Sequence, residues 1–506
     1  MIFKPNNYNE LKEAVDIYTD NKEQGIGKYG NISSWDVSKV TNMRILFKNK
    51  QHFNEDISSW DTSNVVNMAG MFYDAFEFNQ PLNNWNTSKV ETMGKMFFSA
   101  NEFNQPIDSW DTSSVKNMEG MFEYAVCFNQ PLDSWNTSKV KSMQNMFTSA
   151  RKFNQPLDSW DTSNVKKMIG MFNNALSFNQ PLNSLDVSSV EHMEYMFKNA
   201  NSFNQPLNSW NTSKVKNMST MFMHAHEFNQ PLDCWDTSKV ENMREMFNNA
   251  NSFNQCLNSW DTSNVKNMHA LFCQCRCFNQ PLDSWDTSNV KNMESMFREA
   301  TSFNQPLDSW NTSNVENMKR MFASTSFNQP LYSWNTSNVK DMGGMFFSSS
   351  FNHPLRNWNV KSVKNMGGMF FSSSFNQSLD SWDTCSVETM SGMFNNAYNF
   401  NGDISNWNTH NVKTMWGMFI GAESFNQPLD SWDTSNVENM EFMFSGAESF
   451  NQPLTSWNTD KLINTGYMFK CAGSMLRTFP NLKETPDTTN WKENFHRAKP
   501  TKGARY

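Results

Sequence analysis

A single 25-residue unit recurs through most of this chain. One copy, residues 278–302, reads FNQPLDSWDTSNVKNMESMFREATS. Its tryptophan sets the register of 18 copies, of which one carries leucine at that position. Fourteen of the intervals between copies are 25 residues long, and three are 24. The register positions are Trp35, Trp60, Trp85, Trp110, Trp135, Trp160, Leu185, Trp210, Trp235, Trp260, Trp285, Trp310, Trp334, Trp358, Trp382, Trp407, Trp432 and Trp457.

The repeat outweighs the length of the chain as a guide to architecture. A chain of 506 residues would ordinarily suggest several domains. A fixed period between about 20 and 50 residues instead indicates a solenoid, in which each unit is one coil that contacts its neighbours. We therefore expect one elongated domain of about 18 coils.

Each unit begins with a pattern that predicts a short strand. Leu282, Trp285, Thr287 and Val290 have the spacing of the leucine-rich-repeat strand L-x-x-L-x-L-x-x-N. Side chains alternate between the two faces of a strand, so these residues are expected to point inward. The strand is placed at residues 284–287, with Asp286 pointing outward.

The second half of each unit predicts a short helix. Apolar residues recur there at i, i+3, i+6, i+7 and i+10, as one stripe of a helix would: Val290, Met293, Met296, Phe297 and Ala300. Phe303 then re-enters the core, and Asn304 is expected to bond loop backbone as one member of a buried ladder. The predicted fold class is an α/β solenoid, leucine-rich-repeat-like, with one short strand and one short helix per coil.

The two ends of the chain depart from the repeat. Residues 1–30 are expected to form an N-terminal capping helix over the first coil, because a terminal repeat otherwise exposes an apolar face. The solenoid is expected over residues 31–472, and residues 473–506 form a C-terminal cap and basic tail. The cap has a candidate helix at residues 490–498, and the tail carries Arg497, Lys499, Lys502 and Arg505. The helical stripe of the N-terminal cap is Tyr8, Leu11, Ala14, Val15 and Tyr18.

The three 24-residue coils are consecutive, over residues 311–390. Phe297 and Phe303 are six residues apart, whereas Phe322 and Phe327 are only five apart. The missing residue therefore comes from the end of the predicted helix. We expect a bend or a change of twist over these coils.

The string FNQPL-x-SW-[DN]-TS-x-V-x-x-M-x-x-MF-x-x-A resembles the BspA-like leucine-rich-repeat proteins, in the branch found among mycoplasma surface lipoproteins. The resemblance covers residues 31 to about 472, and the first coil with its lead-in, residues 10–43, is similar as well. It implies a leucine-rich-repeat-like solenoid with a role in adhesion or partner binding. Secreted members carry a signal or lipid-anchor segment, and no such segment is visible here.

Net charge and the absence of visible targeting segments restrict the expected classes of partner and the expected location. A formal net charge of −8 argues against nucleic acid as a partner, because a nucleic-acid-binding face is usually basic. No apolar run is long enough to span a membrane. No signal peptide is visible, so an intracellular location is the default expectation, although related family members are surface proteins. A protein partner is expected, and the oligomeric state is left open.

Catalytic or metal-binding residues should appear as departures from the repeat. Asp286 and Ser288 have equivalents in nearly every coil without an accompanying histidine column, so no catalytic residue and no cofactor is assigned. The methionines recur at core spacing and predict packing rather than copper or haem ligation. Cys273, Cys275 and Cys277 form the densest departure, but C-x-C-x-C lacks the usual zinc-knuckle spacing.

The residue that follows each tryptophan is always aspartate or asparagine. This Asp/Asn column is predicted to point outward, and it allows two interpretations. Short polar side chains can bond neighbouring backbone groups in a tight turn. Alternatively, the column is an extended acidic face that binds a partner. Its acidic members are the candidate partner-binding residues: Asp36, Asp61, Asp111, Asp161, Asp186, Asp236, Asp261, Asp286, Asp383 and Asp433.

These patterns predict a non-enzymatic protein-interaction or adhesion scaffold that uses the Asp/Asn column. One alternative is a structural or surface-coat protein, whose role depends on length and regularity. The other is a metal-binding protein or enzyme centred on the cysteine-rich coils at residues 234–277.

Overall fold

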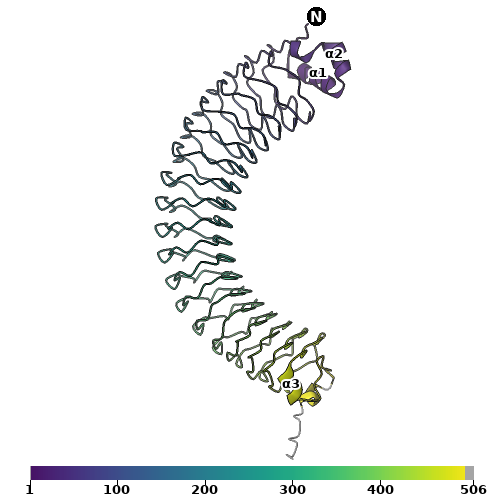
Figure 1. Cartoon of the computed structure of the whole chain (residues 1–506), viewed down its shortest axis with the longest axis vertical. Helices are drawn as coiled ribbons and strands as arrows, with labels where there is room; N and C mark the ends of the chain where they lie inside the picture. Colours follow the sequence, from purple (N-terminus) through teal and green to yellow (C-terminus); the bar gives the residue numbers. More distant parts are fainter. Residues whose placement is uncertain (1, 490, 496–506) are drawn as a thin grey trace, which may run out of the picture. The chain divides into compact units, whose positions relative to one another are not determined.

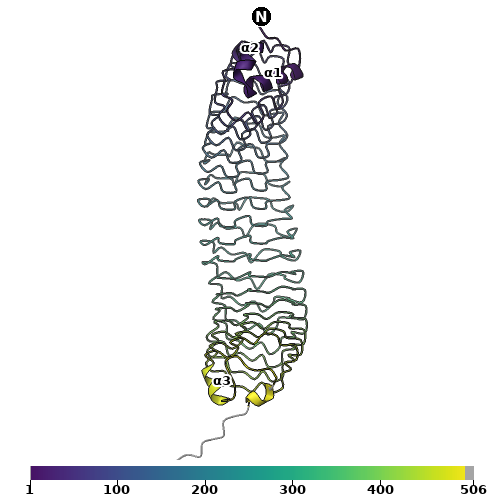
Figure 2. The same cartoon turned by 90° about the vertical axis from the view of Figure 1, so that its right-hand side faces the viewer.

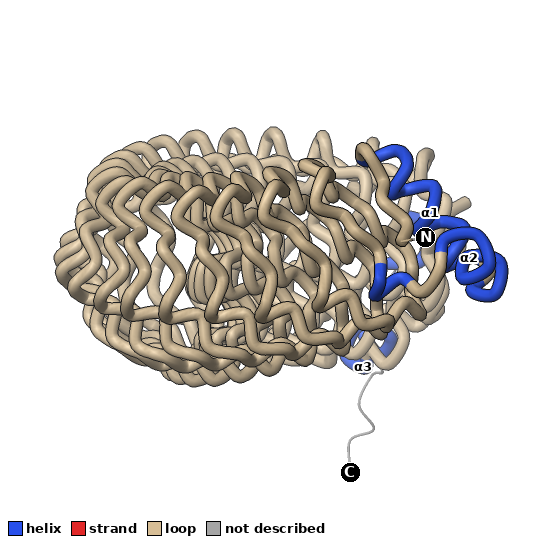
Figure 3. Tube along the Cα trace, turned by 90° about the horizontal axis from the view of Figure 1, so that it is seen from above, coloured by secondary structure: helices blue, strands red, loops and turns tan. Residues whose placement is uncertain are grey.

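The computed structural model describes residues 2–489 and 491–495, and the chain divides into two compact units. The first unit is Met1–Asp261 and the second is Thr262–Tyr506. Within each unit, the repeats form successive coils that stack face to face (Figures 1 and 2). The expectation of a repeat solenoid is therefore confirmed. Among the described residues, helices occur only near the two chain ends (Figure 3).

The coils are built from turns, so the prediction of one helix and one strand per coil is wrong. All residues from Trp35 to Ala472 are described, and none of them lies in a helix or a named strand. The predicted strand at residues 284–287 contains a turn, in which the Trp285 amide donates to the Leu282 carbonyl at 3.2 Å. A second turn follows directly, because the Val290 amide donates to the Thr287 carbonyl at 3.0 Å.

The predicted helix is instead a ladder segment, which we define as the residues six to fourteen positions after each tryptophan. In the first coil, the Met43 amide donates to the Asn67 carbonyl of the next coil at 2.8 Å. The Leu46 amide donates back to Met43 at 3.3 Å and closes a turn within its own coil. Ile45 and Asn49 have left-handed backbone, with φ of 53° and 65°. The chain therefore alternates between bonds to the next coil and tight turns.

The tight turns of the ladder segment explain why its sequence pattern resembled that of a helix. They return the chain to the core every three or four residues, which is also the spacing of one helical stripe. A left-handed backbone suits glycine, because its lack of Cβ removes the steric penalty. Glycine occupies the tenth position after tryptophan in several coils, as at Gly70, Gly120 and Gly170. Regular parallel bridges, such as Asn67 with Thr92, connect the ladder segments of adjacent coils.

Aromatic side chains stack along the core of each unit. The rings of Trp85 and Trp110 lie 6.4 Å apart at 5°, and the Trp110 Nε1–H donates to the Leu82 carbonyl of the preceding coil at 2.9 Å. Phe97 stacks on Phe103 at 3.9 Å within one coil. Since each ring packs between its counterparts, every coil depends on its neighbours for burial. All the residues predicted to point inward in the 278–302 unit, including the methionines, are buried.

A ladder of asparagine and glutamine runs beside this core, as expected for Asn304 and its equivalents. The Asn104 Oδ1 accepts from the Asn129 amide at 2.9 Å and from the Gln130 Nε2 at 3.1 Å. The same bonds recur from Asn279 to Asn304 and Gln305. This ladder satisfies loop amides that have no partner within their own coil.

The N-terminal region contains two helices rather than one. Helix α1 (Tyr8–Asp20) is capped by Asn7, and it buries Leu11, Ala14, Val15 and Tyr18. Helix α2 (Lys22–Tyr29) and a 3-10 helix (Ile32–Ser34) follow. Tyr18, Tyr29 and Phe3 surround the outer face of Trp35, with ring centroids 5.0–6.0 Å away. These aromatic rings cover the first tryptophan of the stack.

The last coil is covered by a tryptophan from outside the repeat. After helix α3 (Gly473–Thr478), a 3-10 helix spans Trp491–Phe495 within the stretch predicted to be helical. Trp491 stacks on Trp457 at 6.3 Å and 4°, and its Nε1–H donates to the Leu454 carbonyl at 2.7 Å. The end of the stack thus repeats the contacts of its interior. The predicted basic residues Arg497, Lys499, Lys502 and Arg505 lie outside the described residues.

The 24-residue coils lack one turn. In a 25-residue coil such as that of Trp85, the Phe103 amide donates to the Ala100 carbonyl at 3.1 Å. In two of the shorter coils a buried serine hydroxyl replaces that carbonyl, as where the Ser349 Oγ accepts from the Phe351 amide at 3.2 Å. Ser373 does the same for Phe375 at 3.3 Å. The deletion is therefore compensated locally, and a bend over residues 311–390 stays a prediction.

Candidate functional site: the exposed faces of the coils

The Asp/Asn column is exposed and takes part in local turns. The Asp61 Oδ1 accepts from the Ser63 amide, two residues later, at 3.0 Å. Asn86 makes the equivalent bond to Ser88 at 3.1 Å, so aspartate and asparagine perform the same local function. Such bonds recur along the column in both units, with acceptors that include Asp36, Asp111, Asp161, Asp186, Asp236, Asp286, Asp383 and Asp433. Asp261 is exposed as well.

These bonds shift the acidities of several column members. Hydrogen bonds from Ser63 hold the pKa of Asp61 below its ordinary value, and the same cause acts at Asp111, Asp161 and Asp236. The Lys4 ammonium, 2.7 Å from Asp36, and the turn serine lower the pKa of Asp36 to about 2. Hydrogen bonds from Ser435 and then His410 lower the pKa of Asp433 to about 2. Each of these shifts favours the ionised carboxylate in the folded protein.

The ladder segments carry the side chains that differ most from coil to coil. The ninth residue after tryptophan is, in the first unit, Arg44, Ala69, Gly94, Glu119, Gln144, Ile169, Glu194, Ser219 and Arg244. The tenth and thirteenth residues vary as widely. We name the exposed and half-buried side chains at these three positions the ladder face. The sequence pattern did not single out this face, because these positions fell on the outer side of the predicted helix, although their variability from repeat to repeat was already visible.

Aromatic and basic side chains lie together on the ladder face of the first unit. The Lys48 Nζ lies 4.7 Å from the ring centroid of Tyr73. Tyr73 stacks on Phe98 of the next coil at 4.3 Å and 6°. Phe98 meets Tyr124, which lies one position beyond the ladder face, edge-on at 5.5 Å. The Lys95 Nζ lies 5.6 Å from the ring centroid of Phe98. Tyr124 is 44% exposed, so this aromatic row reaches solvent.

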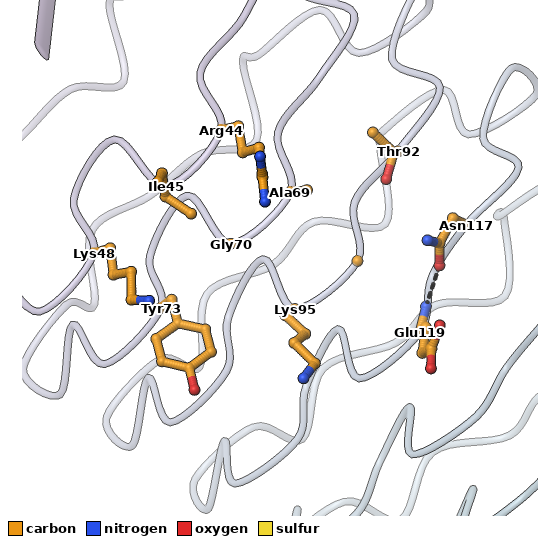
Figure 4. A pocket seen from close by; sticks show the side chains of 11 residues that line it. Arg44, Ile45, Lys48, Ala69, Gly70, Tyr73, Thr92, Lys95, Asn117 and Glu119 are labelled. Carbon is orange, nitrogen blue, oxygen red and sulfur yellow. Dashed lines mark hydrogen bonds between the residues drawn. The ribbon is translucent and has the colours of Figure 1, made fainter.

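A pocket of about 300 Å³ opens beside that row (Figure 4). Its lining includes three small residues, Ala69, Gly70 and Gly94, from the second and third coils. Larger side chains from the first four coils surround them: Arg44, Ile45, Lys48, Tyr73, Thr92, Lys95, Asn117 and Glu119. The pocket thus exists because two successive coils carry small residues where others carry long side chains.

The second unit has its own aromatic side chains on the ladder face. Phe347 and Phe371 stack at 4.6 Å and 11°. Further along, Trp416 meets Phe442 edge-on at 6.4 Å, and Phe442 stacks on Tyr467 at 5.5 Å. Trp416 and Tyr467 are exposed. Exposed aromatic clusters of this kind are typical of protein-binding surfaces, where large rigid side chains bury much area at little entropic cost.

The cysteine-rich coils show packing roles. Cys275 is fully buried in the small-residue column that alanine fills in other coils, and burial raises the pKa of its thiol well above the ordinary value. Cys273 is 7% exposed, whereas Cys277 is exposed. Over residues 2–489 and 491–495, no group of three or more His, Cys, Asp or Glu side chains is arranged to hold a metal ion. The described helices also include none long and apolar enough to cross a membrane.

Comparison with solved structures gives weak similarities. The chain is similar to the plant peptide hormone receptor RGFR1 in complex with RGF2, at 9% identity and a TM-score of 0.23, over 86% of this chain and 78% of that chain. It is similar to a leucine-rich-repeat protein of Leptospira interrogans at 9% identity and a TM-score of 0.18, over 90% and 96% of the two chains. A TLR13–ssRNA13 complex matches at 8% identity and a TM-score of 0.18, over 89% and 88%. TM-scores this low support no argument about function.

Comparison with protein families gives a direct assignment. A search of curated proteins finds no match for this chain. One family model, in contrast, matches six overlapping stretches that together span most of the repeats: residues 16–134, 102–207, 125–235, 220–326, 309–388 and 371–482. The chain therefore belongs to the family described as "Mycoplasma protein of unknown function, DUF285".

Proposed function

We propose that this protein is a non-enzymatic, BspA-like scaffold that binds other proteins through its ladder face. The observation that carries the proposal is the contrast between columns. Core and turn positions repeat the same residue types in coil after coil, whereas the ladder-face positions vary and carry exposed aromatic side chains. Residues at positions that core packing does not constrain can vary to fit a partner. Solenoids commonly bind their partners along such extended faces.

The proposal moves the binding contacts away from the Asp/Asn column. The Asp61 Oδ1 is engaged by Ser63, and Asn86 makes the same bond without a charge. A column that accepts either residue meets a need of the backbone turn. The role of Asp36, Asp61, Asp111, Asp161, Asp186, Asp236, Asp261, Asp286, Asp383 and Asp433 as partner contacts stays a prediction, to be compared directly with the ladder face.

Affinity capture with matched variants of the full chain tests the proposal. In the ladder variant, Tyr73, Phe98, Phe347 and Phe371 are each changed to serine. In the column variant, Asp61, Asp111, Asp286 and Asp383 are each changed to asparagine, which keeps the turn acceptor and removes the charge. Extract from a source cell is passed over each immobilised protein, and stoichiometric partners are identified by mass spectrometry.

We expect the ladder variant to lose the partners that the wild type retains, and the column variant to keep them. The opposite result would move binding to the Asp/Asn column. Retention by both variants would contradict the proposed location on either face. Thermal unfolding of each variant checks that the coils remain folded.

A further inference from the structure

Three basic side chains line the pocket of the first unit, and within the described residues none of them forms a close ion pair. These side chains, Arg44, Lys48 and Lys95, are exposed. Lysines elsewhere on the same unit do form such pairs, as where the Lys116 Nζ lies 2.8 Å from Glu91 and the Lys216 Nζ lies 2.8 Å from Glu191. The pocket therefore places three cations near two carboxylates, those of Glu119 and Glu123, which leaves a local excess of positive charge in a chain whose net charge is −8.

The aromatic row holds two of these charges close to the pocket. Lys48 lies over the ring of Tyr73, and Lys95 lies over the ring of Phe98. Arg44 lines the same pocket near Ala69 (Figure 4). A cation over an aromatic face is attracted by the negative ring quadrupole, which restricts the long side chain. Ligand binding then costs less side-chain entropy than it would with freely rotating lysines. The restrained lysine ammonium groups are therefore well placed to bind an anionic group.

The small residues Ala69, Gly70 and Gly94 leave space in the pocket for both the backbone and the side chains of a bound segment. Ala69 and Gly94 occupy positions where the later coils of this unit carry Glu194 and Arg244. A Cβ on Gly70 would lie 3.1 Å from the Ile45 Cγ2, so the glycine lets Ile45 pack down onto it. The pocket consequently combines an apolar wall, an aromatic side and a basic rim.

We infer that this pocket binds an extended protein segment that carries carboxylate side chains next to apolar or aromatic ones. The carboxylates would pair with Arg44, Lys48 and Lys95, since hydrogen bonds between ionised partners are the stronger ones. The apolar residues would contact Tyr73 and Phe98. This inference rests on the proposed protein-binding function and adds the chemical class of the partner.

The acidic groups around the pocket disfavour a polyanion as the occupant. Glu119 lines the same pocket, and Glu123 follows in the same coil. Burial raises the pKa of Glu123, and this effect exceeds the opposing charge of Lys95, while the charge of Glu119 adds to it. A nucleic acid places phosphates at every step of its backbone and would meet these carboxylates. A peptide can place a few carboxylates on the three cations alone.

Fluorescence anisotropy with the full chain tests the site. The probe is a fluorescein-labelled peptide of glutamate pairs alternating with phenylalanine, and the comparison probes are its lysine counterpart and a short labelled oligothymidylate. Three proteins are measured: the wild type, a pocket variant with Arg44→Glu, Lys48→Glu and Lys95→Glu, and a control variant with Lys139→Glu, Lys141→Glu and Lys166→Glu. The two variants have the same net charge, so their difference isolates position from charge.

We expect the wild type to bind the glutamate peptide, and the pocket variant to bind it about 30-fold or more weakly, as the loss of two or three charge-assisted contacts predicts. The control variant should differ from the wild type by less than about threefold, the residual long-range effect of charge. Ala69→Trp, which fills the pocket and keeps every charge, should weaken binding about 10-fold or more by excluding the segment.

Three results would overturn the inference: no binding of the glutamate peptide by the wild type, stronger binding of the lysine peptide or oligothymidylate, or equal losses in the pocket and control variants. Capture of the natural partners separates this outcome from failure of the proposed function. If the pocket variant still captures every partner of the wild type, the scaffold role stands and only this site is rejected.

Discussion

The Asp/Asn column and the ladder face both lie on the surface, but the column keeps its residue type from coil to coil and the ladder face does not. The column keeps aspartate or asparagine in every coil, and its side chains bond the turn that follows. The ladder face places arginine, glycine, glutamate or isoleucine at one equivalent position. In a repeat protein, a surface residue that is constant from coil to coil thus has a structural role, because it bonds the backbone. A surface position that varies has no such role and can contact a partner. Four changes, ordered by expected effect on stability, can break or sharpen that comparison.

Among the constant columns, the buried tryptophans should contribute most to the free energy of unfolding. Trp110→Ala removes stacking on Trp85 and the bond to the Leu82 carbonyl, and it should lower the free energy of unfolding by about 3–5 kcal/mol. Urea unfolding measures the loss, and hydrogen exchange should place it mainly in the coils on either side. Trp110→Leu should cost less, because Leu185 already occupies this column in the native protein. A loss below about 1 kcal/mol for the alanine variant would contradict the role of the stack.

The asparagine ladder should come next. Asn104→Ala leaves the half-buried Asn129 amide without its acceptor and should cost about 1–2 kcal/mol, since a partly buried donor then lacks its hydrogen bond. Chemical unfolding is again the measurement. The control is Glu102→Ala, an exposed change two residues away that should have little effect. Equal costs for the two variants would mean that the ladder bond contributes nothing measurable.

The Asp/Asn column should show a smaller effect that separates its two interpretations. Asp61→Ala removes the acceptor of the Ser63 amide and should cost about 1 kcal/mol, whereas Asp61→Asn keeps that acceptor and should cost only a few tenths. If Asp61→Ala is as stable as the wild type, the column does not brace its turn.

The same residue predicts a pH dependence. The folded-state pKa of Asp61 is lowered, so the stabilisation from its carboxylate is present above the unfolded pKa of about 3.9 and is lost as the pH falls through the folded value. The advantage of the wild type over Asp61→Asn should therefore shrink below about pH 4. Thermal unfolding of both proteins at pH 7 and at lower pH checks the sign. An advantage that grows in acid would contradict the lowered pKa.

The ladder face should show the smallest effect on stability and the largest on binding. Tyr73→Ala removes a half-buried ring that stacks on Phe98, and it should change the unfolding free energy by no more than about 0.5–1 kcal/mol. Its effect should appear in partner capture or in peptide affinity. A large loss of stability at Tyr73 would make it a packing residue and would weaken the distinction between the two faces.

The sequence predicted the core far better than it predicted the backbone. Trp285, Val290 and Phe297 are buried as expected, because burial of equivalent side chains is what a repeat preserves. The turns of the ladder segment were mistaken for a helix, since both geometries return to the core at the same spacing. Glycine at positions such as Gly70 and Gly120 was the available signal of left-handed backbone.

The candidate site divides in the same way. The outward direction and the turn-bonding interpretation of the Asp/Asn column could be reached from residue type alone, because short polar side chains favour such bonds. The pocket between the first four coils could not. It depends on which neighbouring residues are small and on how Lys48 and Lys95 settle over aromatic rings of adjacent coils. Those facts require the stacking of coils to be known.

The covers over the first and last tryptophans have a consequence for assembly. In a stack of similar coils, the exposed face of the last coil is complementary to the exposed face of the first coil of another molecule. Uncovered edges of this kind favour end-to-end association. Phe3, Tyr18 and Tyr29 at one terminus and Trp491 at the other act as chain terminators for that process. A coil inserted within the array would lengthen the molecule without disturbing either terminator.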